Sequence, residues 1–102
     1  MNKLLNLLGL CMRAGKVVSG EQGVEIAVKG KKAFLVIISS DASKNTMKKF
    51  KNSCEYYNVP YIVISDKYTL GSAIGKDNRA VIGITEEGFA LKLKELSETC
   101  DN

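Results

Sequence analysis

An unbroken apolar run at residues 33–38, Ala-Phe-Leu-Val-Ile-Ile, is the feature that most constrains how this chain folds. The run is short and rich in β-branched residues, which is typical of a strand covered on both faces. A polar, glycine-bearing turn at residues 19–22 and a lysine-rich turn at residues 29–32 come before it. We therefore expect a buried strand that holds polar loops in place, as functional loops usually require.

Helical and strand patterns alternate along the whole chain. Apolar residues at helical spacing predict five helices, the first at residues 2–14. Short apolar runs predict strands at residues 16–18, 33–38, 61–64 and 80–84. A chain of 102 residues suits one domain. The pattern predicts a single-domain, three-layer α/β/α sandwich (residues 1–102), with a sheet of about four strands and helices on both faces.

Several helix starts carry side chains that favour N-capping. Ser19, with Gln22 three positions later, fits a capping box for the second helix. Residues 39–41, together with Ser43, offer side-chain oxygens to the third helix. Thr85 is predicted to cap the last helix, which has an acidic first turn. Each cap would fix the angle at which a loop meets its helix.

The charge balance permits a polyanionic partner such as RNA. Fifteen basic and eleven acidic residues give a net charge of +4, with a pI near 9.0. That balance weakly favours nucleic-acid binding. A lysine-rich solvated surface explains the same charge equally well.

The cysteine and histidine content argues against a metal site and against a disulfide framework. The three cysteines are widely spaced, none forms a CxxC pair, and histidine is absent. We expect no cofactor and no metal, and Cys11 and Cys54 should act as small apolar residues in a reducing cytoplasm.

The N-terminal segment resembles a short export signal only superficially. Its apolar run is broken by Asn6 and followed at once by Arg13 and Lys16, so we predict a helix of the mature domain. No stretch reaches the roughly 18 apolar residues of a membrane span, so no membrane partner is expected.

The sequence offers little for catalysis. Without histidine, the commonest general base is absent, and no Ser–His or Cys–His pair can form. Asp41, at the end of the buried strand, is the one candidate for holding Mg²⁺ in a phosphotransfer site. A single aspartate at that position is more often a helix cap. We therefore predict that the chain is not an enzyme and has no catalytic residues.

Binding is better supported, because three loop regions carry glycine, polar or basic residues. They lie at residues 19–22, 41–44 and 76–79. If they meet at one end of the sandwich, helix N-termini would present free N–H groups to phosphates, and lysines would add attraction. Taken singly, the first two regions are explained as helix caps and the third as a solvated turn.

The order of several short motifs resembles a known family. The motifs are Arg13-Ala14-Gly15-Lys16, Gly20-x-Gln22, Ala27-Val28-x-Gly30, Ala33-x-Leu35-Val36-Ile37-Ile38-x-x-Asp41, Val59-Pro60-Tyr61, Leu70-Gly71-x-Ala73-Ile74-Gly75 and Glu87-Gly88-Phe89-Ala90. Together they resemble the L-seven-Ae/L-thirty-e superfamily of ribosomal and kink-turn RNA-binding proteins, especially its small bacterial YlxQ-type members. The resemblance implies a mixed sheet and RNA recognition without catalysis.

The resemblance can be carried over residue by residue at the second helix. Kink-turn binders of the family use a Gly-x-Asn-Glu turn and a following lysine against sheared G·A pairs. Gly20 matches the glycine, and Gln22 stands where the asparagine would be. Gly23 replaces the glutamate and Ile26 replaces the lysine, so two expected groups are missing. Gln22 retains an amide that can contact a base edge.

We predict a monomeric cytoplasmic protein that binds structured RNA and associates with the ribosome. The alternative is an adaptor of the same fold that binds protein and no nucleic acid. The resemblance matches Lys67 to a family lysine and places Ser43 where the third helix meets RNA. The residues predicted to contact RNA are Gly20, Glu21, Gln22, Lys31, Lys32, Ser43, Lys44, Lys67, Lys76, Asn78 and Arg79.

Overall fold

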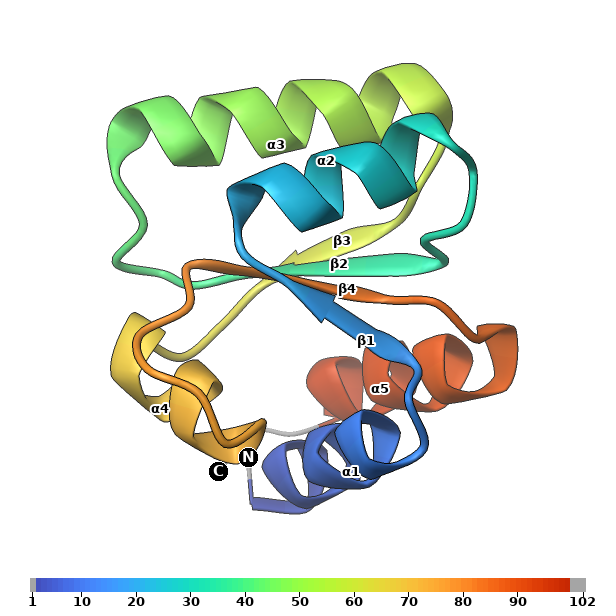
Figure 1. Ribbon diagram of the computed structural model, residues 1–102, viewed down its shortest axis with the longest axis vertical. Helices are drawn as coiled ribbons and strands as arrows, with labels where there is room; N and C mark the ends of the chain where they lie inside the picture. Colours follow the sequence, from blue (N-terminus) through green and yellow to red (C-terminus); the bar gives the residue numbers. More distant parts are fainter. Residues whose placement is uncertain (1, 100–102) are drawn as a thin grey trace.

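A four-stranded sheet lies between two layers of helices in the computed structural model (Figure 1). The structure describes residues 2–99. Its elements, in chain order, are α1 (Asn2–Arg13), β1 (Val17–Ser19), α2 (Glu21–Lys29), β2 (Leu35–Ile38), α3 (Lys44–Tyr57), β3 (Tyr61–Val63), α4 (Lys67–Ala73), β4 (Val81–Ile84) and α5 (Glu87–Thr99). Helices α2 and α3 cover one face of the sheet, and α1, α4 and α5 cover the other (Figure 1).

The sheet is mixed, with the strand order β1-β4-β2-β3. Strand β4 pairs antiparallel with both β1 and β2, whereas β3 pairs parallel with β2. Strand β1 is an edge strand, as expected from its short sequence. The predicted α/β/α sandwich with a mixed sheet of four strands is confirmed.

The central strand β2 explains why residues 33–38 form an unbroken apolar run. Alternate side chains of a strand point to opposite faces. Leu35 and Ile37 pack in the core shared with α1, α4 and α5, whereas Val36 and Ile38 pack in the core beneath α2 and α3. All four strand residues are fully buried, but Phe34, just before the strand, is 40% exposed. The prediction of a strand covered on both faces holds for Leu35–Ile38.

Two cysteines behave as buried apolar residues. Cys11, on α1, lies in the core shared by α1, α4 and α5. Cys54, on α3, lies in the core beneath α2 and α3. Burial raises the pKa of each thiol to about 11, so both stay protonated at neutral pH. Cys100 lies outside the described residues.

Two of the predicted helix caps are wrong. Ser19 is the last residue of β1, where it pairs with Ile82, and Gly20 takes the N-cap position of α2 without any side-chain cap. At the last helix, the Thr85 N–H donates to the Lys16 carbonyl, so Thr85 is still held by the sheet. The Glu86 carboxylate caps α5 instead, accepting from the Phe89 N–H at 2.7 Å.

The third predicted cap is confirmed for Ser43 alone. The Ser43 Oγ accepts from the Thr46 N–H at 3.1 Å and so caps α3. The Asp41 carboxylate reaches a different helix, accepting from the Lys67 N–H at the start of α4. The Ser39 hydroxyl is buried and has no hydrogen-bond partner among the described residues.

No helix within residues 2–99 is both long and apolar enough to span a membrane. The same residues contain no group of three or more His, Cys, Asp or Glu side chains that could hold a metal ion.

Candidate functional site

Strand direction brings the three polar loops to one end of the sheet. Strands β1, β2 and β3 run the same way, because β1 and β2 are antiparallel to β4 and β3 is parallel to β2. Helices α2, α3 and α4 therefore begin at the same end, where the chain also enters β4 (Figure 1). We call this the helix-start end; it comprises residues 19–22, 39–46, 64–67 and 74–80. The opposite end, with residues 29–34 and 57–60, is the helix-finish end.

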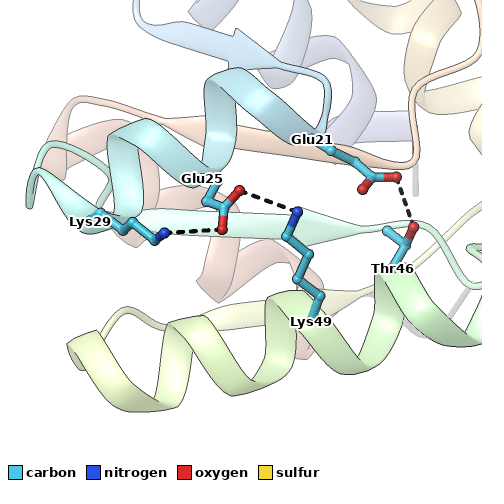
Figure 2. Close-up of polar contacts among 5 residues, drawn as sticks. All are labelled: Glu21, Glu25, Lys29, Thr46 and Lys49. Atoms are coloured by element: carbon cyan, nitrogen blue, oxygen red, sulfur yellow. Dashed lines mark hydrogen bonds and ion pairs between the residues drawn. The ribbon is translucent and has the colours of Figure 1, made fainter.

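A chain of hydrogen bonds joins the first turns of α2 and α3. The Thr46 Oγ1 donates to the Glu21 Oε2 at 2.8 Å (Figure 2). The Ser43 Oγ donates to the Thr46 Oγ1 at 3.0 Å while accepting from the Thr46 backbone N–H. The Glu21 carboxylate, predicted as an RNA contact, is thus bonded within the protein and holds two helix starts together.

The start of α4 is linked both to the loop after β2 and to the loop before β4. The Lys67 N–H donates to the Asp41 Oδ1 at 3.0 Å, and the Lys67 carbonyl accepts from the Arg79 N–H at 3.0 Å. The Asp66 carboxylate caps α4 by accepting from the Thr69 N–H at 2.8 Å and from its hydroxyl at 2.9 Å. The hydrogen bonds from Thr69 hold the pKa of Asp66 below its ordinary value. The backbone near Lys67 is therefore fixed from two sides.

The Arg79 guanidinium is oriented by two hydrogen bonds. Its Nε donates to the Ser19 Oγ at 3.3 Å, and its Nη1 donates to the Asn78 carbonyl at 3.0 Å. Guanidinium carries five donors in a planar fork, so donors remain for an anion. An arginine held in this way can bind a phosphate with less loss of side-chain freedom than a free lysine.

The N-cap residue of α2 is a glycine, Gly20, so no side chain caps the helix. Gly20 has φ 87° and ψ 157°, a backbone conformation that favours glycine, and its N–H donates to the Val81 carbonyl at 3.1 Å. The first N–H groups of a helix have no partner within the helix. Gln22 is exposed in this first turn, beside these donors. The arrangement suits an anion or a polar base edge.

The basic residues at the helix-start end lack carboxylate partners, in contrast to those between α2 and α3. Glu25 binds the Nζ of Lys29 at 3.3 Å and of Lys49 at 3.2 Å (Figure 2). These two ammonium groups lower the pKa of Glu25. Within residues 2–99, Lys67 and Arg79 form no ion pair with any carboxylate, so their charge is available to a ligand.

Not all the predicted contact residues lie together. Lys44 is exposed at the first turn of α3, at the helix-start end, and Asn78 is exposed in the loop before β4. Lys76 is in the same loop but close to the end of α4, where its N–H donates to the Gly71 carbonyl. Lys31 and Lys32 lie at the helix-finish end, at the far end of α2 from Gly20 (Figure 1).

Sequence reasoning missed the residues that assemble the site. Thr46 joins α3 to α2, and Ser19 orients Arg79, across separations of 25 and 60 residues. Neither contact leaves a local pattern. Asp41 does accept a hydrogen bond from a helix N-terminus, as predicted, but the helix is α4 and not α3. The choice between the two helices depends on the fold.

The fold is that of a recognised class of small domains. Residues 2–94 match the model of the Ribosomal protein L7Ae/L30e/S12e/Gadd45 family. The chain therefore belongs to this family. The match covers all four strands and nearly all of the described helices, including every residue of the helix-start end.

Similar proteins include a named bacterial relative and two solved structures. The chain is 48% identical over 90 residues to the RNA-binding protein YlxQ of Bacillus subtilis, covering 88% of this chain and 90% of the relative. A protein of unknown function from Bacillus halodurans C has a TM-score of 0.93 at 43% identity, covering 96% of this chain and 99% of that one. The Giardia lamblia 15.5kD RNA binding protein has a TM-score of 0.82 at 27% identity, with 95% and 86% covered. These names describe RNA-binding proteins or no activity, and none describes an enzyme.

Proposed function

We propose that this chain binds structured RNA through its helix-start end. The observation that carries the proposal is the convergence, at one end of the sheet, of the α2 N-terminus, which has no side-chain cap, with Lys67 and Arg79, which form no ion pair with a carboxylate within residues 2–99. Membership of a family of ribosomal proteins supports it, as do the names of the Bacillus subtilis and Giardia lamblia relatives.

The residues at this end would divide the work of recognition. Gly20 has no side chain, so an RNA groove can approach the first N–H groups of α2, which suit a phosphate. The Gln22 amide can donate to and accept from a base edge. Arg79 would bind a phosphate through its planar fork, and Lys44 and Lys67 would add attraction that depends on salt but not on sequence.

A finer proposal concerns the kind of RNA. We propose a kink-turn-like element, with Gln22 in the place of the asparagine that family members use, and ribosomal RNA in the cytoplasm as its source. Gly23 and Ile26 stand where those members have glutamate and lysine. A Cβ added at position 23 would meet no atom within 4 Å, and Ile26 is 66% exposed, so both positions have room for a longer side chain.

The test is the affinity of the pure protein for three RNAs across a salt series. They are a kink-turn with sheared G·A pairs, the same RNA with those pairs made Watson–Crick, and a pool of ribosomal RNA fragments. Tight binding to the first alone is the expected result. Equal binding to all three, with a steep salt dependence, would contradict the kink-turn proposal but keep RNA binding. No binding at moderate salt would overturn the proposed function and favour the protein-binding adaptor.

A restoring variant, Gly23→Glu with Ile26→Lys, sharpens this test. It is expected to strengthen binding to the kink-turn by about tenfold, the value of one good base contact of 1–3 kcal/mol. Binding to the Watson–Crick version should change by less than about twofold, because the net charge is unchanged. An equal gain on both RNAs would show that the new side chains do not contact the G·A pairs.

A further inference from the structure

A row of lysines runs along α3, away from the helix-start end. Lys44, Lys48 and Lys51 recur at intervals of four and three residues, which places them on one side of the helix. They line a shallow hollow of about 430 Å³ together with Ala42, Met47, Asn52 and Glu55. We call the three lysines the α3 track. It begins at the first residue of α3, so it is continuous with the site described above.

The track lies on the side of α3 turned away from α2. Thr46, Phe50 and Cys54 form the buried face of α3, and Lys49, on the flank toward α2, is bound to Glu25 (Figure 2). The successive rotation of about 100° per residue then places Lys44 and Lys51 on the opposite flank. Their charges face solvent, where a large ligand can approach.

The lysines of the α3 track differ from most other lysines on the described helices. Glu25 neutralises Lys29 and Lys49, and on α5 Lys92 pairs with Glu95 and Lys94 with Glu98. In residues 2–99 none of the three track lysines pairs with a carboxylate. Glu55, the one acid that lines the hollow, accepts from the Tyr61 hydroxyl at 3.3 Å and marks the far end of the track.

The lining of the hollow indicates the chemistry of its ligand. Its polar lining consists of three lysines, an asparagine amide and, at the far end, the Glu55 carboxylate, with no aromatic ring on which a base could stack. The rise of an α-helix separates Lys44 from Lys51 by about 10 Å, a straight row of positive charge. A sugar–phosphate backbone fits such a row better than unpaired bases do.

We infer that the α3 track binds the phosphate backbone of a double-helical RNA stem adjacent to the element held at the helix-start end. The inference rests on the proposed function and extends it to Lys48 and Lys51, which the site above does not include. The track would lengthen the interface and make affinity depend on the length of the flanking stem, without adding base specificity.

The test compares Lys48→Gln/Lys51→Gln with the charge-matched control Lys92→Gln/Lys94→Gln on α5. Two RNAs share one structured element, and one has a flanking stem longer by a full helical turn. The α3 variant should bind the long RNA about tenfold more weakly at moderate salt, and its salt slope should fall by about 1.8, or 0.9 per lost phosphate contact. Its affinity for the short RNA, and the affinity of the control for both, should change by less than about twofold.

Three results would overturn the inference. The α3 variant could match the α5 control on both RNAs, or it could lose equal affinity for the long and the short RNA, as a general charge effect requires. Either result leaves the proposed function intact provided that the parent binds the short RNA. If the parent binds neither RNA, both proposals fail. Urea unfolding of each variant excludes a folding defect, which is not expected because Lys48 is exposed and Lys51 partly so.

Discussion

The two ends of the sheet both carry lysines, but their loops are held in different ways. At the helix-start end, side-chain hydrogen bonds join α2 to α3 and the Asp41 loop to α4. At the helix-finish end, the turn after α2 is held by backbone bonds, among them Lys31 N–H to Val28 O and Lys32 N–H to Ala27 O. Lys31 also adopts φ 58°, the left-handed conformation after a helix that glycine usually occupies.

Helix polarity explains why equal charges have different uses at the two ends. The N-terminus of a helix carries partial positive charge and the C-terminus partial negative charge. Lys31 and Lys32 follow the C-terminus of α2, so they complement the dipole of that helix. Lys67 and Arg79 lie beside helix N-termini, where they add to a positive field. Asp41 and Asp66 offset part of it at the start of α4, and a bound anion would be favoured there as well. A count of lysines cannot make this distinction.

The largest expected effect comes from disturbing the loop that carries Arg79. In Gly71→Ala the new Cβ would lie 1.9 Å from the Asp77 carbonyl oxygen, so the backbone of the loop must move. We expect a loss of about 3 kcal/mol in the free energy of unfolding, typical of severe overpacking, and weaker RNA binding. Gly30→Ala, at the helix-finish end, meets its nearest atom at 3.2 Å and should change stability by less than about 1 kcal/mol. Urea unfolding measures both, and equal losses would contradict the close contact.

A smaller effect is expected from removing charge at either end. Lys67→Gln/Arg79→Gln should weaken RNA binding by about tenfold or more and flatten the salt slope by one to two units, since each phosphate contact contributes about 0.9. Lys31→Gln/Lys32→Gln removes the same charge, and we expect a change of about twofold or less. Affinities of both variants for the same RNA, measured over a salt series, test this difference. If the second variant loses as much as the first, the helix-finish end also contacts RNA and the two ends do not differ in RNA binding.

The smallest effect is the pH dependence of the Asp66 cap at the helix-start end. The pKa of Asp66 is lowered in the folded protein, so its cap is fully stabilising above the unfolded pKa, near 4, and weakens as the pH falls through the folded value. Asp66→Ser keeps a capping oxygen without the charge. Between pH 7 and pH 3, the parent should lose more stability in urea than this variant. Equal losses would mean that the cap does not depend on the ionised carboxylate.

Much of the fold follows from local patterns. The alternation of helices and strands, the buried strand at residues 35–38 and the cap at Ser43 all depend on residues close in sequence. Gly15, just after α1, has a positive φ of 74°, a conformation typical of a glycine that ends a helix. The errors at Ser19 and Thr85 have one cause: both residues are held by strand pairing, which a local cap signal does not detect.

The candidate site was predictable in its parts and not in its assembly. By itself the sequence determined which loops are polar, which helix starts carry glycine or serine, and that the strand at residues 35–38 is buried on both faces. Tertiary structure alone decided that three of those loops meet, that Asp41 bonds to α4, and that Lys31 and Lys32 lie elsewhere. The reason is physical, because helix and strand periodicity arise from neighbouring residues, whereas the direction and order of strands depend on pairings between distant parts of the chain.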